Sequence, residues 1–180
     1  MSTTATQGQT WNIDAGHSSI DFKVRHMAIA TTKGHFKTFT ATAMTEGGVL
    51  KSLEATIEAE SVTTNEAQRD GHLKSPDFFD VANHPKITVK STNVKHVSDN
   101  TYEIAADLTL RGVTKPVTFK AEVGSPIKDP WGNQRAAANI TGKLNRKDWG
   151  LNWNMVLELG GLMVSEEVTF DFDVEMVGQA

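Results

Sequence analysis

The most regular feature of the chain is an alternation of apolar and polar residues with a period of two. It runs through residues 20–25, 102–110, 117–123 and 168–176, where an apolar side chain recurs at every second position. Successive side chains of a strand point to opposite faces, so each segment predicts a strand with one dry and one wet face. Such strands are typical of antiparallel sheets, because parallel sheets are usually covered on both faces.

Four weaker segments bring the expected number of strands to about eight. Residues 86–94 and 136–144 are rich in β-branched or alternating apolar residues, and residues 35–43 carry two phenylalanines at an odd spacing that suggests a bulge. Residues 53–59 fit a helix as well as a strand, and we interpret them as a strand because a better helix start follows. About eight antiparallel strands in one small domain are compatible with two architectures, a closed barrel or a sandwich. Long strands favour the barrel, because closure removes exposed strand edges.

One helical excursion interrupts the strands. Thr63 and Glu66 have the spacing of a capping box, with Thr63 as the N-cap, and predict a helix that ends near residues 71–73. A second short helical turn is expected at Ser75-Pro76-Asp77, where serine caps and proline takes the first helical position.

Length and composition limit the possible functions. The chain has 180 residues, which predicts one domain, and its formal net charge of −4 gives no basic surface of the kind that nucleic-acid binding requires. It has no cysteine, which excludes disulfides, thiolate metal sites and cysteine nucleophiles. No apolar run is long enough for a membrane-spanning helix.

The first ten residues are small and polar, and we expect residues 1–10 to be a disordered tail and residues 11–180 to form the barrel domain. They contain no basic segment followed by an apolar one, so the sequence as written has no signal peptide. This predicts a cytoplasmic protein, or a periplasmic or exported one if a leader has been removed.

The dry faces mix large side chains with small ones such as Ala106 and Ala121. A small eight-stranded barrel either is filled by side chains or holds one small ligand, and the small residues are compatible with both. A cavity with this apolar lining would bind a lipid or a prenyl chain. The register predicts the following lining residues: Ile20, Phe22, Val24, His26, Phe36, Ile57, Ile104, Ala106, Leu108, Phe119, Ala121, Ile140, Phe170 and Phe172.

The polar candidates for chemistry are few. None of the six histidines lies in a metal-binding motif, so we assign no metal; His26 continues the inward register and is a candidate for binding a ligand head group. Arg69, Asp70 and His72 are compatible with an acid–base set, but we favour a structural role in which Arg69 or Asp70 ties the helix to the barrel rim. We assign no catalytic residue.

Two further segments have no ordinary strand pattern. Residues 149–159 are rich in aromatic and aliphatic side chains interrupted by asparagine, and they are interpreted as a lid over a pore or as a dimer face. Residues 27–29, between the first two strands, are open to the same two interpretations, as part of a lid or of a dimer face. Gly112 is expected to adopt a positive φ in a hairpin turn.

Several ordered strings in the chain resemble one known family. The strings are Asp14-Ala15-Gly16-His17-Ser18, Gly34-His35-Phe36, residues 59–64, 69–73 and 77–80, His84-Pro85, residues 108–117, Arg146-Lys147-Asp148-Trp149-Gly150 and Glu167-Val168. In this order they resemble the YceI-like family of bacterial polyisoprenoid-binding proteins, from Trp11 to Glu175.

The resemblance implies an all-β fold: an extended, lipocalin-like barrel of eight antiparallel strands whose apolar pore holds a polyisoprenoid or similar long-tailed amphiphile. It also implies a homodimer and a role in isoprenoid-quinone metabolism, transport or storage. We therefore expect a non-enzymatic carrier of a long-chain lipid such as an isoprenoid quinone, without other cofactors. Two alternatives stay open: an enzyme of isoprenoid or lipid metabolism with histidine and carboxylate groups at the pore mouth, and a filled barrel that acts through protein contacts alone.

Overall fold

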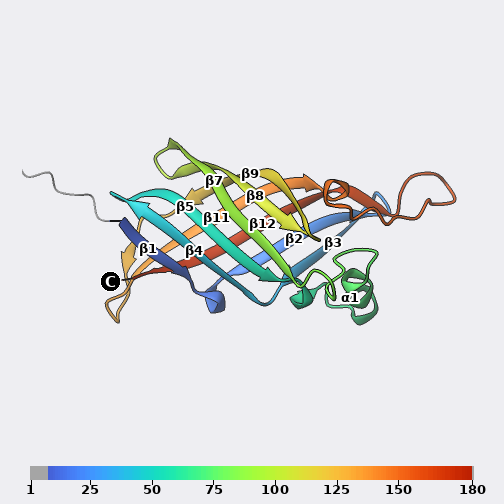
Figure 1. The fold of residues 1–180 in the computed structure, drawn as a ribbon, viewed down its shortest axis with the longest axis horizontal. Helices are drawn as coiled ribbons and strands as arrows, with labels where there is room; N and C mark the ends of the chain where they lie inside the picture. Colours follow the sequence, from blue (N-terminus) through green and yellow to red (C-terminus); the bar gives the residue numbers. More distant parts are fainter. Residues whose placement is uncertain (1–7, 180) are drawn as a thin grey trace, which may run out of the picture.

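The fold is an antiparallel β-barrel with one short helix, seen in a computed structural model that describes residues 8–179 (Figure 1). The strands are β1 Gly8–Ile13, β2 Ser19–His26, β3 Ala30–Phe36, β4 Phe39–Glu46, β5 Val49–Glu58, β6 Val62–Thr63, β7 Lys86–Ser98, β8 Thr101–Leu110, β9 Val113–Val123, β10 Ile127–Lys128, β11 Gln134–Asn145 and β12 Val164–Gly178. The helix α1 is Ala67–Lys74, and the 3₁₀ turns are η1 Ala15–His17, η2 Ala59–Ser61 and η3 Arg146–Trp149.

Eight strands close the barrel in the order β11, β9, β8, β7, β5, β4, β1 and β12, and the pairing of β12 with β11 completes the ring. Every pairing is antiparallel. The predicted eight-stranded antiparallel barrel is thus confirmed, with four additional strands. Of these, β2, β3 and β6 extend the wall beside the first half of β12, and β10 pairs with β11.

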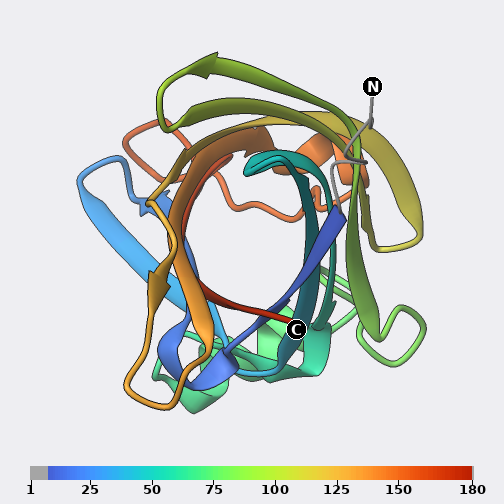
Figure 2. The same ribbon diagram turned by 90° about the vertical axis from the view of Figure 1, so that its left-hand side faces the viewer.

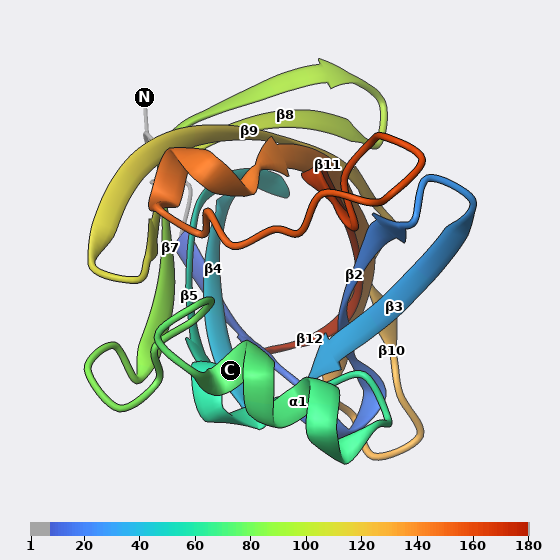
Figure 3. The ribbon, with the colours of Figure 1, turned by 90° about the vertical axis from the view of Figure 1, so that its right-hand side faces the viewer.

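The barrel has two unlike ends. Strand β1 begins and β12 ends at one end of the barrel, which we call the terminal end (Figure 2). At the opposite end, the mouth, α1 and its flanking segment lie on one side, and η3 and the segment after it lie on the other (Figure 3). The mouth is therefore surrounded largely by connecting segments and not by the ring of eight strands alone.

The alternation of the sequence becomes the inside and outside of the wall. In β8, for example, Tyr102, Ile104, Ala106, Leu108 and Leu110 are buried while the residues between them are half-buried or exposed. The ambiguous segment 53–59 lies mostly in β5, so the prediction of a strand is confirmed.

The start of the helix was predicted wrongly. Glu66, not Thr63, is the N-cap of α1, and its carboxylate accepts hydrogen bonds from the backbone N–H groups of Gln68 and Arg69. Thr63 lies in β6 and pairs with His35 of β3. Asn65 has a φ of 63°, in the left-handed region, so no continuous helix can run from Thr63 through this position.

Three other local predictions differ from the structure. Residues 75–77 do not start a second helix: Ser75 is the C-cap of α1, and a turn follows. Residues 35–43 form no single bulged strand, because the chain bends at residues 37–38 and divides the segment between β3 and β4. Residues 8–10, expected in a disordered tail, begin β1, where backbone pairing with β4 holds them; residues 1–7 lie outside the described part of the chain.

Candidate functional site

The candidate site is a cavity of about 720 Å³ in the half of the barrel next to the mouth. Its wall is mostly apolar and comes from strands, from α1 and from the segments beside the mouth. The apolar lining residues are Ile20, Phe22, Val24, Phe36, Ile57, Leu73, Phe78, Phe79, Ile87, Val89, Leu108, Leu110, Phe119, Leu144, Leu151, Trp153, Met163, Val164, Val168, Phe170 and Phe172. The polar lining residues are Asp21, His26, Thr32, Thr64, Glu66, Gln68, Arg69, His72 and Arg146.

Aromatic rings form the inner limit of the cavity. Phe119 and Phe170 contact edge to face with their ring centroids 5.1 Å apart, and Phe172 stacks on Phe170 at the same distance. Beyond them, toward the terminal end, the barrel is filled: Tyr102, Ile104 and other side chains are buried against one another in the core. The barrel therefore has a hollow half and a filled half.

Two glycines make room for the rings. A Cβ atom on Gly34 would overlap the ring of Phe22, and one on Gly142 would overlap the ring of Phe170. The tip of each ring therefore lies over the glycine backbone of the neighbouring strand. A side chain in place of either glycine would displace the ring of Phe22 or of Phe170, both of which line the cavity.

Ten of the predicted lining residues lie on the cavity wall, namely Ile20, Phe22, Val24, His26, Phe36, Ile57, Leu108, Phe119, Phe170 and Phe172. The structure does not place Ile104, Ala106, Ala121 or Ile140 there. Ile104, Ala106 and Ala121 are completely or almost completely buried in the filled half, and Ile140 packs against the core. The register identifies the inner face of a strand, but it does not show which half of that face side chains from the opposite wall will cover.

The sequence analysis missed several lining residues. Ile87 and Val89 belong to the predicted strand 86–94 and carry an alternation that would have placed them on the inner face. Phe78, Leu151 and Trp153 come from non-strand segments, where no periodicity shows which side chains turn inward. The segment 149–159 is thus partly a wall of the cavity.

His72 stands among aromatic rings at the mouth. Its Nε2 lies 2.8 Å from Asp77 Oδ2, and its ring contacts those of Trp153 and Phe78 edge to face, with centroid distances of 4.7 Å and 5.1 Å. The carboxylate and the two rings fix the orientation of the imidazole. Its Nδ1 makes no hydrogen bond to residues 8–179.

Arg69 and Asp70 both hold the helix to the rim, as expected for the structural interpretation. Asp70 accepts hydrogen bonds from the hydroxyls of Thr63 and Thr64 and from the backbone N–H of Thr64. Burial by itself would raise the pKa of Asp70, but these hydrogen bonds and the charge of Arg69 lower it. Arg69 donates to the hydroxyl and the carbonyl of Thr64.

Arg146 supports the opposite side of the mouth from within. It is 3% exposed, and its guanidinium donates to the backbone carbonyls of Leu151, Trp153, Val164 and Ser165. Burial lowers the pKa of Arg146, and the nearby Glu166 opposes that effect. These bonds join the start of β12 to the segment that carries two cavity residues, so one side chain fixes this part of the wall.

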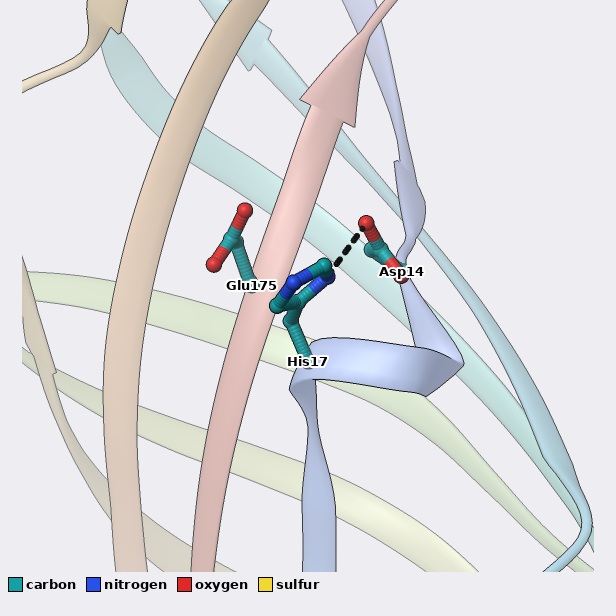
Figure 4. Close-up of side chains that lie close together, drawn as sticks. All are labelled: Asp14, His17 and Glu175. Carbon is teal, nitrogen blue, oxygen red and sulfur yellow. Dashed lines mark hydrogen bonds and ion pairs between the residues drawn. The ribbon is translucent and has the colours of Figure 1, made fainter.

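A second polar group lies on the outside of the barrel. Asp14, His17 and Glu175 are the one group of three potential metal ligands among residues 8–179 (Figure 4). The guanidinium of Arg135 already binds Asp14 and Glu175, and it also binds Asp129. We interpret the group as an ion-pair network that joins η1, β12 and the β10–β11 hairpin.

The network shifts the pKa values of its members. The hydrogen bond from Arg135, then that from His17, lowers the pKa of Asp14 from its ordinary value of 3.8 to about 2. Hydrogen bonding by Arg135 also holds the pKa of Asp129 well below its ordinary range, against the opposing effect of burial. His26 and His35 take no part in the group: His26 lines the cavity, and His35 lies on β3 opposite Asp21.

Two apolar tips extend past the mouth, residues 27–29 in the β2–β3 turn and residues 155–162 before β12; we call them the mouth tips (Figure 1). They are adjacent, since the backbone N–H of Met27 donates to the carbonyl of Met163 at 2.8 Å. Met27 and Ala28 have φ values of 51° and 60°, a region that favours glycine or asparagine. The turn keeps apolar residues there despite the strain.

A family model for the YceI-like domain matches residues 11–176. The chain belongs to the YceI-like family. It is 34% identical over 168 residues to a UPF0312 protein of Staphylococcus aureus (strain N315), covering 92% of this chain and 95% of that protein. The resemblance found in the sequence is therefore confirmed.

The fold of this YceI-like protein is also similar to solved structures. Burkholderia cenocepacia BcnA has a TM-score of 0.79 at 19% identity, covering 91% of this chain and 98% of that one. A polyisoprenoid binding domain from Saccharophagus degradans, implicated in plant cell wall breakdown, has a TM-score of 0.70 at 16% identity, covering 94% of this chain and 98% of that one. At these identities the likeness shows the barrel fold.

The longest string of the resemblance holds the mouth of this YceI-like barrel together. Arg111 and Gly112 form the β8–β9 turn with φ values of 50° and 70°, which confirms the positive φ predicted for Gly112. The guanidinium of Arg111 donates to the carbonyls of Phe78 and Gly150, one on each side of the mouth. The indole N–H of Trp149 donates to the carbonyl of Leu108 at 3.0 Å. These residues set the width of the opening.

Proposed function

We propose that this YceI-like protein binds the tail of a long isoprenoid or similar amphiphile in its hollow half and acts as a carrier or store of that lipid, not as an enzyme. The observation that carries the proposal is the apolar cavity of about 720 Å³ with its polar groups around the mouth. Its volume lies within the range of about 300–1,000 Å³ that is common for small-molecule sites. Each buried methylene contributes about 0.8 kcal/mol before the ordering cost of the ligand is subtracted.

The distribution of polar groups supports an amphiphilic ligand. His26, Arg69, His72 and Arg146 belong to the elements around the mouth, whereas Phe119, Phe170 and Phe172 close the inner end. A tail directed inward would thus meet hydrocarbon and aromatic surface, and a head group with oxygen acceptors, such as a quinone, would remain near His72 and Arg69. The name of the Saccharophagus degradans domain, polyisoprenoid binding, supports the same class of ligand.

The polar side chains also support a binding role over catalysis. Asp70 is engaged by Thr63 and Thr64, and Arg69 by Thr64, so both hold the rim. The histidine and carboxylate pair that borders the cavity, His72 and Asp77, is positioned by ring contacts with Phe78 and Trp153, two residues of the cavity wall. We therefore assign His72 to orientation of the ligand head group.

The direct test is to extract the purified protein with organic solvent and to examine the extract by mass spectrometry. We expect a long-tailed isoprenoid or related lipid in stoichiometric amount. A second measurement titrates delipidated protein with geraniol, farnesol and geranylgeraniol, followed by tryptophan fluorescence. Affinity should rise with each added isoprene unit until the cavity is full, because apolar contacts add with buried area.

The same titrations test the physical basis of binding. Affinity should change little between low and high salt. At 1 M salt the interactions between charges are screened beyond about 3 Å, whereas apolar contacts are not screened. A chelator should also leave binding unchanged. An extract without lipid together with no affinity for any of the three alcohols would contradict the proposal, as would a loss of binding in chelator or a steep loss in salt.

A further inference from the structure

The exposed large apolar side chains of the described chain are concentrated at the mouth. The mouth tips carry Ile29, Val156 and Leu159, of which Ile29 is 86% exposed and Val156 75% exposed, together with the partly exposed Met27 and Met155. Isolated exposed apolar residues are ordinary on protein surfaces, but a group confined to two adjacent loops indicates an interaction surface. The two loops that carry these residues extend past the barrel wall (Figure 1).

The tips are continuous with the cavity. Val24 and His26 line the cavity, and residues 27–29 follow directly along the chain. Met163 and Val164 also line the cavity and directly follow the second tip. A ligand tail that leaves through the mouth would therefore pass from the cavity wall beside His26 onto the largely apolar surface of the tips, where Glu158 is the one charged residue.

Positive charge lies immediately behind the first tip. Lys23, Arg25 and Lys33 are exposed on the outer face of the β2–β3 hairpin, and Lys23 lies directly opposite Lys33. Like charges directly opposite one another in a sheet are destabilising, so the pair does not serve the hairpin itself. Among residues 8–179, none of the three takes part in an ion pair.

We propose that the mouth tips dock this protein on an anionic lipid bilayer, with their apolar side chains in the acyl region and Lys23, Arg25 and Lys33 at the phosphate level. The inference rests on the proposed function, since a carrier must exchange its lipid with a lipid phase. An apolar tip with basic residues just behind it matches the layered polarity of a bilayer surface. No helix among residues 8–179 has the length and apolar character needed to cross a membrane, and the docking is peripheral.

The test is flotation of delipidated protein with vesicles of phosphatidylcholine alone and of an equimolar mixture with phosphatidylglycerol. We expect the wild type to float with both and more strongly with the mixture. The double variant Ile29→Ser/Leu159→Ser should lose at least tenfold in partitioning to either vesicle, because two exposed side chains no longer enter the acyl region. The variant Lys23→Gln/Lys33→Gln should lose about tenfold on the mixture and little on phosphatidylcholine alone.

A matched control is available at the terminal end, where Ile127 and Trp131 are also exposed. The variant Ile127→Ser/Trp131→Ser should float like the wild type. Equal loss in this control and in the tip variant would overturn the proposal, and so would flotation that the tip substitutions leave unchanged. Sedimentation velocity adds a second criterion: if the tip variant dissociates a wild-type dimer, the tips are a protein interface and the proposal is wrong.

Farnesol binding separates this inference from the proposed function. The tip variants should bind farnesol in solution as the wild type does, since the cavity is unchanged, while transfer of geranylgeraniol from vesicles should slow at least tenfold. A wild type that binds farnesol but does not float overturns the docking alone. A wild type that floats but binds none of the prenyl alcohols overturns the proposed function and shows that docking does not depend on cargo.

Discussion

The two halves of the barrel have the same strands and the same alternation, yet one is filled and the other is hollow. In β8, Ile104 and Ala106 are completely buried in the filled half, while Leu108 and Leu110, farther along the same face, line the cavity. In β9, Phe119 lines the cavity and Ala121, two residues later, does not. The difference therefore depends on what faces each residue from across the barrel.

The terminal half is closed by the ring of eight strands, with Trp11 of β1 and Tyr102 of β8 in its core. The mouth half is bounded by continuations of these strands, such as β7, β8 and β12, and in addition by β2, β3 and the segments around α1 and η3. These segments hold the opening by hydrogen bonds from Arg111 and Arg146 to backbone carbonyls, so it is not filled by side chains from opposing strands. A wall built from connecting segments leaves space that a regular small barrel would fill.

The largest expected effect comes from placing the same large side chain in each half. Ala106→Trp adds an indole to a completely buried site, and we expect it to lower the free energy of unfolding by about 3 kcal/mol or more. Val89→Trp, whose side chain points into the cavity, should change stability by less than about 1 kcal/mol but lower farnesol affinity at least tenfold. Urea unfolding and farnesol titration of both variants check this. If Val89→Trp is the more destabilising of the two, the assignment of the halves is wrong.

Next in size is the effect of removing the buried guanidinium that holds the wall of the hollow half. Arg146→Met keeps much of the volume but leaves the carbonyls of Leu151 and Trp153 without this donor, and we expect a loss of about 2 kcal/mol and weaker farnesol binding. Lys147→Met is the matched control, because Lys147 pairs with Glu166 at the surface and should affect neither measurement. Unaltered farnesol affinity in Arg146→Met would show that the wall does not depend on this residue.

A smaller effect is expected where a glycine allows a ring to lie against the wall. In Gly34→Ala the new methyl group forces the Phe22 ring away from β3 and toward the cavity, so stability should fall by about 1 kcal/mol and farnesol affinity about threefold. The double variant Gly34→Ala/Phe22→Leu should recover affinity, because the smaller side chain removes the clash. Failure of the second substitution to restore binding would contradict this explanation.

The smallest effect concerns the exposed ion-pair network of Arg135, which lies outside the cavity. The pKa of Asp14 is lowered in the folded state from 3.8 to about 2, so its stabilising contribution is present above about pH 4 and is lost as the pH falls toward 2. In Arg135→Gln the contribution of Asp14 to the pH dependence of stability should become smaller. The urea midpoint of this variant should therefore fall less steeply than that of the wild type between about pH 5 and 2. Farnesol affinity should stay the same. A midpoint with the same pH dependence in both proteins would show that the network does not contribute.

Much of this architecture was determined by local sequence. The alternation in residues 102–110 and 117–123 identified strands and their inner faces, and it led to cavity residues such as Leu108 and Phe119. The rule of alternation is local because a strand reverses its side chains at every residue whatever lies around it. The helix was predicted from local sequence as well. Its N-cap was misplaced because Thr63 pairs with β3, and that pairing is a tertiary contact that the local sequence does not show.

Only the tertiary structure decided which part of the inner face is empty. The alternation by itself left both a filled barrel and a cavity open, and its register placed Ala106 and Ala121 on the pore. The space beside a small residue depends on the side chains that arrive from other strands, and for these two it is filled. The cavity depends in the same way on Phe78, Leu151 and Trp153, whose backbone carbonyls are held by hydrogen bonds from Arg111 and Arg146 and whose inward positions follow no local period.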